Sequence, residues 1–118
     1  MNALRFALYA IAALIVVDGD TVKAPYGVTY RLLGFDAPET HFAKCKAERE
    51  LGLAAKERLE QLVATTEVKV IESGKRDKYG RTLATLTANG RDVGDVLIGE
   101  GLARPYHGER RKSWCRAE

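Results

Sequence analysis

Apolar residues recur at helical spacing along one long segment, residues 46–63, with charged residues between them. The apolar positions are Ala47, Leu51, Ala55, Leu59, Leu62 and Val63. This spacing predicts an amphipathic helix with one face towards a core, and it places Glu48 on the polar face. Gly52 weakens the helix by ~1 kcal/mol relative to alanine. A second, shorter helix is expected over residues 93–100, with Asp92 as its N-cap.

The remaining apolar segments are short or alternate with polar positions, which is typical of strands. The expected strands cover the end of the apolar run before Asp18 and residues 21–24, 28–35, 68–72, 81–88 and 91–93. Asn89-Gly90 lies between the last two and is a strong hairpin signal. Antiparallel strands with a helix between the third and fourth fit an α+β fold, a small OB-type β-barrel of about five strands with two helices.

Length and composition indicate one globular domain. The chain has 118 residues, of which 46% are hydrophobic and 30% charged, so neither two full cores nor a disordered chain is expected. We assign residues 11–118 to a single domain and residues 1–10 to a targeting leader remnant or a strand extension. The apolar run 6–17 is short for a membrane span. It favours a secreted, periplasmic or membrane-anchored location slightly over the cytoplasm.

Charge is distributed unevenly, although the net charge is only +3. Residues 1–40 are slightly acidic, whereas residues 69–81 and the tail from Arg104 are basic. This balance permits a nucleic-acid partner without requiring one. Cys45 and Cys115 would form one disulfide in an exported protein and would remain two free thiols in the cytosol. No Cys/His set with the spacing of a zinc site is present.

Carboxylates and arginines between residues 20 and 81 suggest phosphoryl chemistry. Asp20 lies on a tight turn, and Asp36 and Glu39 follow a strand, so their oxygens would suit Ca²⁺ or Mg²⁺. Arg31 and Arg81 would donate paired hydrogen bonds to phosphate oxygens. A free carboxylate such as Glu39 would position or deprotonate a water molecule. Each motif alone also has a structural explanation, as a turn, a helix entry or a solvated loop.

Three motifs in the same order strengthen the functional interpretation. They are Asp18-Gly19-Asp20-Thr21, the segment RLLGFDAPET at residues 31–40, and Asp77-Lys78-Tyr79-Gly80-Arg81. Together with Gly101-Leu102-Ala103 they closely resemble the staphylococcal nuclease (thermonuclease) family over roughly residues 14–107. The resemblance implies an OB-fold barrel and a calcium-dependent nuclease that cleaves the phosphodiester bonds of DNA and RNA.

The resemblance also implies a role for individual residues. Asp20, Asp36 and the backbone carbonyl of Ala37 resemble the Ca²⁺ ligands of the family. Arg31 and Arg81 resemble its phosphate-binding arginines, and Glu39 resembles the residue that orients or activates water. Lys78 and Tyr79 match positions that contact the substrate, and Tyr106 is expected to stack on a base.

The chain departs from the family prototype at its end. A short basic tail replaces a long final helix, and a Cys45–Cys115 disulfide would fasten this tail to the first helix. The protein is expected to be a monomer with no obligate protein partner. The alternative is a non-catalytic OB-fold module that binds nucleic acid or another protein.

Overall fold

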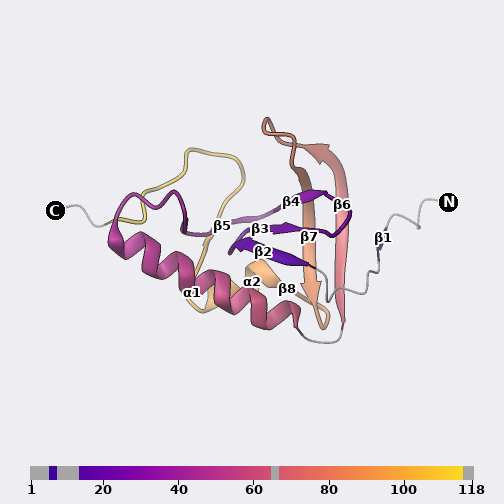
Figure 1. The fold of residues 1–118 in the computed structure, drawn as a ribbon, viewed down its shortest axis with the longest axis horizontal. Coiled ribbons are helices and arrows are strands. Elements are labelled where there is room, and N and C mark those ends of the chain that lie inside the picture. Colours follow the sequence, from indigo (N-terminus) through magenta and orange to yellow (C-terminus); the bar gives the residue numbers. More distant parts are fainter. Residues whose placement is uncertain (1–5, 8–13, 65–66, 116–118) are drawn as a thin grey trace.

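A seven-stranded sheet and two helices form most of the structure, a computed structural model that describes residues 6–7, 14–64 and 67–115 (Figure 1). The strands are β1 Phe6–Ala7, β2 Ile15–Asp18, β3 Thr21–Lys23, β4 Thr29–Leu32, β5 Phe35–Asp36, β6 Val68–Arg76, β7 Thr82–Ala88, β8 Arg91–Asp92 and β9 Arg104–Pro105. The helices are α1 Lys46–Val63 and α2 Val93–Gly99. The α+β class with two helices is confirmed.

The sheet is mixed, so the prediction of wholly antiparallel strands is wrong. Its strand order is β1-β6-β7-β4-β3-β2, and β8 pairs with β7. Strands β4 and β7 are parallel, with Arg31 opposite Leu83. A parallel pair needs a long crossover connection, which α1 and β6 supply. The pairings of the described residues place β1 and β2 at opposite ends of the strand order and do not show a closed barrel.

A turn at Leu33-Gly34 divides the expected strand 28–35 into β4 and β5. Gly34 has a φ of +92°, a value that side-chain-bearing residues rarely adopt and that interrupts the strand. Beyond this turn β5 leaves the main sheet and pairs with β9, with Asp36 opposite Arg104. The turn therefore allows Arg31 on β4 and Asp36 on β5 to face each other.

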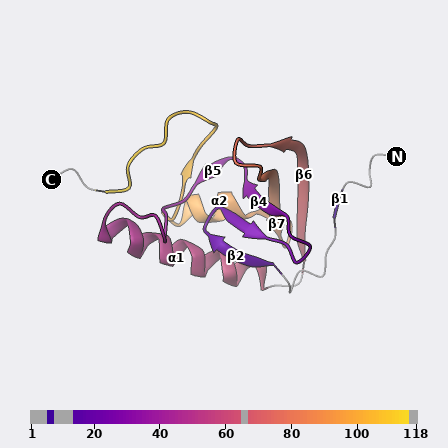
Figure 2. The ribbon, with the colours of Figure 1, turned by 45° about the horizontal axis from the view of Figure 1, so that its top comes forward.

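The two helices begin as the sequence predicts. Helix α1 occupies residues 46–63, and the Sγ atom of Cys45 accepts a hydrogen bond from the Glu48 amide at 3.3 Å. In α2 the Asp92 carboxylate caps the N-terminus by accepting from the Gly94 amide at 2.7 Å. Helix α1 crosses one side of the sheet in both ribbon views, and α2 lies between α1 and the long β6–β7 hairpin (Figures 1 and 2). The core between these layers includes Val22, Tyr30, Leu32, Leu59, Val70, Leu86 and Leu97.

The beginning of the chain is described only in part. Strand β1 pairs with β6, with Phe6 opposite Ile71. The rest of the proposed leader, and residues 8–13 of the apolar run, lie outside the described residues. In the described ranges, no helix combines the length and hydrophobicity that a membrane span requires.

Gly52 brings α1 into close contact with the loop that carries Glu39. A Cβ atom added at Gly52 would lie 2.8 Å from the Glu39 carbonyl carbon and 3.0 Å from the Pro38 carbonyl oxygen. Real Cβ atoms essentially never approach other atoms below 3.0 Å, and both neighbours are backbone atoms. Glycine, which lowers helix propensity, is therefore required at position 52 by packing.

We predict that Gly52→Ala lowers the free energy of unfolding by ~1–3 kcal/mol, the usual cost of overpacking. This effect opposes the gain of ~1 kcal/mol that alanine brings in an exposed helix. Thermal and denaturant unfolding measure the change. Gly99→Ala in α2 is the matched control, because the added Cβ has no neighbour within 4 Å. A Gly52→Ala protein at least as stable as Gly99→Ala would contradict the packing argument.

Candidate functional site

Two buried carboxylates lie on either side of Arg31. Asp20 is 5% exposed and Asp36 is 3% exposed. The Arg31 Nη2 atom lies 3.5 Å from Asp20 Oδ2 and 3.7 Å from Asp36 Oδ1. Its Nη1 atom donates to the carbonyls of Leu32 and Phe35. The predicted grouping of these three charged residues is therefore present in the structure.

Strand pairing fixes the position of Asp20. The Leu32 amide donates to the Asp20 carbonyl at 2.8 Å, which ties the β2–β3 turn to β4. The carboxylate of Asp20 accepts from the Thr21 hydroxyl at 3.0 Å and from the Ala37 amide at 2.8 Å. These bonds orient the carboxylate towards Arg31.

Two further carboxylates hold the loop that follows β5. The Asp18 Oδ1 atom accepts from the Thr40 hydroxyl at 2.6 Å and from the Thr40 amide at 3.3 Å. Glu48 accepts from the Glu39 amide at 3.0 Å and from the Lys44 amide at 2.9 Å. Glu48 is 5% exposed, so its predicted place on the polar face of the helix is wrong. Its capacity to accept two loop amides explains why a charged residue is buried there.

Glu39 is half-buried beside these groups. Burial raises the pKa of its carboxyl above the usual value, and the charges of Asp18 and Asp20 raise the pKa further. The Arg111 guanidinium opposes this shift. Burial also raises the pKa of Asp36, against the lowering effect of Arg111. The carboxyls of Glu39 and Asp36 thus bind a proton more readily than they would in water.

Arg111 and Trp114 join this cluster from the end of the chain, and the sequence analysis missed both. The Arg111 Nε atom lies 2.7 Å from Asp36 Oδ1, and its Nη1 atom lies 3.1 Å from Glu39 Oε2. The Trp114 indole N–H donates to Asp36 Oδ2 at 3.2 Å. The only sequence feature that indicated a role for this part of the chain was the basic character of the tail.

Arg81 lies on the connection between β6 and β7, where it contacts Asp77 and Tyr79. Its Nε atom is 2.7 Å from Asp77 Oδ2, and Asp77 is its ion-pair partner in the described part of the chain. Arg81 and Lys78 both lie over the Tyr79 ring, at 5.4 Å and 5.3 Å from its centre. Tyr79 is 71% exposed. The structure thus groups Lys78, Tyr79 and Arg81 with one another.

Tyr106 lies beside Arg31 and shares a cavity with Asp36. The Arg31 guanidinium is 5.8 Å from the centre of its ring. A cavity of about 280 Å³ opens beside Asp36, and Tyr106 lines it together with Arg104, Pro105, Glu109, Arg110 and Lys112. Three basic residues, two acidic residues and one aromatic ring line the cavity, so its wall has a small excess of positive charge that suits an anionic ligand.

The oxygen atoms around Asp36 fit a hard cation. Asp36 Oδ1 is buried and accepts no hydrogen bond, although Arg111 lies near it. The Ala37 carbonyl accepts from the same guanidinium at 3.5 Å. No group of three His, Cys, Asp or Glu side chains in the described part of the chain could hold a metal alone. A cation bound by Asp20, Asp36 and the Ala37 carbonyl would need further oxygen ligands, for which Ca²⁺ commonly uses water.

Comparison with known proteins identifies the family to which the chain belongs. The sequence profile described as "Staphylococcal nuclease homologue" matches residues 29–117. Over 93 residues the chain is 39% identical to the SPbeta prophage-derived endonuclease YokF and 38% identical to the endonuclease YncB, both of Bacillus subtilis (strain 168). These matches cover 75% of the chain but only 31% of YokF and 44% of YncB. The chain belongs to the staphylococcal nuclease homologue family.

Proposed function

We propose that this chain is a calcium-dependent nuclease that hydrolyses the phosphodiester bonds of both DNA and RNA. The observation that carries the proposal is the buried pair Asp20 and Asp36, which shares Arg31. Glu39 follows on the next loop. The two relatives are named endonucleases, and we extend that activity to this chain. We also propose that its sheet forms an OB-type barrel.

Asp20, Asp36 and the carbonyl of Ala37 would hold the Ca²⁺ ion. When bound, Ca²⁺ supplies positive charge that stabilises the negative charge developing on the phosphate oxygens. The burial of both carboxylates supports this role, because buried charges that lack full compensation favour a cation.

Arg31 and Arg81 would donate hydrogen bonds to the phosphate. The carboxylates of Asp20 and Asp36 hold the Arg31 guanidinium in place before substrate arrives, which lowers the cost of organising it. Arg81 pairs with Asp77 and is partly exposed, so it would exchange this carboxylate for a phosphate. Glu39 would accept the proton of the attacking water, and its burial, which raises the pKa of its carboxyl, favours that step.

Nucleotide binding would use aromatic and basic residues of the β6–β7 connection and of the cavity beside Asp36. Tyr79 is exposed and carries Lys78 above its ring, an arrangement that would stack a base and bind a phosphate. Tyr106 would act similarly beside the cavity. We propose that the protein acts as a monomer without an obligate protein partner. The Cys45–Cys115 disulfide supports an oxidising compartment.

We predict that nucleic-acid cleavage requires Ca²⁺. Removing the ion with a chelator leaves the carboxylates without their cation, so cleavage of both plasmid DNA and RNA should stop and should return when Ca²⁺ is added. A gel assay measures both effects. Binding of nucleic acid without any cleavage would instead support the non-catalytic module, and full cleavage in chelator would rule out the calcium role.

We predict that Arg31→Lys and Arg81→Lys each lower kcat by ~10²-fold or more, the usual loss when an oriented hydrogen-bond donor is removed from a reaction site. Lysine keeps the charge but loses the paired donors of arginine. Arg58→Lys is the matched control, because Arg58 makes a comparable two-point contact with Glu100 outside the site. A change confined to KM would assign that arginine to substrate binding alone.

Glu39→Gln should lower kcat by ~10²–10⁴-fold while leaving Ca²⁺ affinity nearly unchanged. Glutamine keeps the size of the side chain but accepts a proton poorly. Glu50→Gln on α1 is the control, because Glu50 makes only a highly exposed ion pair with Lys46 in the described structure. If Glu39 serves only the helix entry, kcat should stay near the wild-type value and the cost should be ~0.3–1 kcal/mol of stability.

A further inference from the structure

Arg111 contacts three groups of the proposed calcium and water-binding site. Its Nε atom pairs with Asp36 Oδ1, its Nη1 atom pairs with Glu39 Oε2, and its Nη2 atom donates to the Ala37 carbonyl. Two carboxylates and a carbonyl are also the contacts that a hard metal cation makes. We infer that Arg111 is an internal cation of this site, and that a divalent cation must displace it in order to bind.

A second residue of the same segment occupies the other oxygen of Asp36. The Trp114 indole N–H donates to Asp36 Oδ2, so residues on one short segment contact both carboxylate oxygens. We call residues 111–115 the C-terminal strap. A divalent ligand of Asp36 would compete with the strap for both oxygens.

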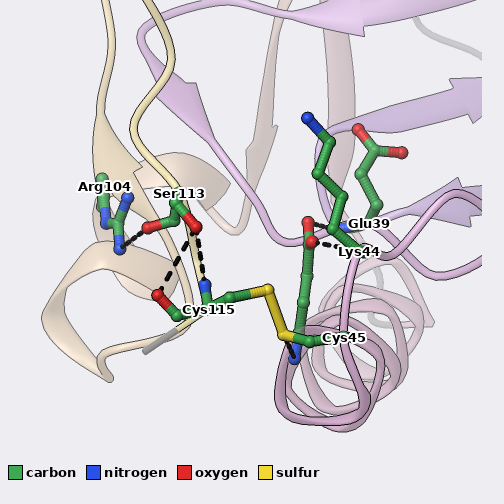
Figure 3. The surroundings of a disulfide bond; sticks show 7 residues. Glu39, Lys44, Cys45, Arg104, Ser113 and Cys115 are labelled. Carbon is green, nitrogen blue, oxygen red and sulfur yellow. Dashed lines mark hydrogen bonds between the residues drawn. A yellow bond between two sulfur atoms is a disulfide. The ribbon is translucent and has the colours of Figure 1, made fainter. Parts of the chain in front are cut away.

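The strap is anchored at its far end. A disulfide joins Cys115 to Cys45, directly before α1, and Ser113 lies close to it (Figure 3). Arg104 on β9 donates to the carbonyls of Lys112 and Ser113 at 3.1 Å and 2.9 Å. Its guanidinium also lies 3.6 Å from the centre of the Trp114 ring. These anchors keep Arg111 near the carboxylates at a high effective concentration, on the order of millimolar for a short tether.

Charge explains why Arg111 and a divalent cation exclude each other. Asp20, Asp36 and Glu39 provide three negative charges, while Arg31 and Arg111 provide two positive ones. With Arg111 in place these five groups have a net charge of −1, instead of −2 without it. A divalent cation beside Asp36 would lie against a charge of the same sign in a partly buried environment, where repulsion is weakly screened. This inference rests on the proposal that Asp20 and Asp36 bind Ca²⁺.

Titration calorimetry with Ca²⁺ in the absence of nucleic acid tests the inference. We expect Arg111→Gln to lower the Kd for Ca²⁺ by ~10-fold, within the usual range of coupling between two bound groups. Arg91→Gln is the matched control. It removes the same charge from an exposed position on β8, and Arg91 makes no ion pair within the described ranges. Its Kd should stay within about two-fold of the wild-type value, as expected for a screened surface charge.

A second variant frees the strap but keeps Arg111. Cys45→Ser/Cys115→Ser removes the anchor, and serine at position 45 remains a good N-cap for α1. Calcium should bind this protein more tightly than wild type, with a smaller gain than in Arg111→Gln. Melting temperature provides an independent measure. Without Ca²⁺, Arg111→Gln should melt below Arg91→Gln, because Asp36 loses one of its two arginine partners, and Ca²⁺ should raise its melting temperature more.

The outcomes separate this inference from the proposed function. Equal Kd values for wild type, Arg111→Gln and the double serine variant would overturn the inference and leave the calcium site intact. An unchanged Kd together with weaker binding of single-stranded DNA would also overturn it and would make Arg111 a phosphate-binding residue. Absence of calcium binding in all the proteins, the wild type included, would overturn the proposed calcium site itself.

Discussion

Burial of two carboxylates so close together is the constraint on which this structure depends. Charged groups removed from water need compensation, and Asp20 and Asp36 share the guanidinium of Arg31. One positive charge leaves the pair with an excess of negative charge. Arg111 supplies a second positive charge from the end of the chain. The cluster is therefore arranged around a demand for cations, which is the property that a metal-dependent phosphodiesterase would use.

The fold meets this constraint through short, interrupted strands. Asp20 follows a tight turn that is bonded to β4, and Asp36 lies on β5, which leaves the main sheet to pair with β9. Neither residue lies in the middle of a long strand, where alternation would have turned neighbouring side chains to opposite faces. Helix α1 then holds the next loop through the buried Glu48 and through the close approach of Gly52. The main sheet thus positions one carboxylate, and the two-residue strands position the other.

Local signals in the sequence were sufficient for the elements that depend on local physics. The apolar spacing of residues 46–63 was enough to predict the helix. The residue pair Asn89-Gly90 was enough to predict the turn, because both residues readily adopt the positive φ angles that they have in the structure. The resemblance also identified Asp20, Asp36 and Arg31, which the fold brings together. Apart from the Cys45–Cys115 disulfide, the contacts between distant segments were not predicted. The parallel pairing of β4 with β7 depends on a crossover, and Arg111 reaches Glu39 across 72 residues of sequence, so neither leaves a periodic pattern.

The disulfide also divides the chain topologically. The bridge between Cys45 and Cys115 encloses both helices and β6–β9, while Asp20, Arg31 and Asp36 lie on the open segment before it. The exposed tip of the β6–β7 hairpin belongs to the enclosed part. A protease that cuts there adds one water molecule but leaves both fragments covalently joined until the bridge is reduced. The covalent ring thereby preserves the connection between the carboxylate-bearing strands and the basic hairpin after the backbone has been cut.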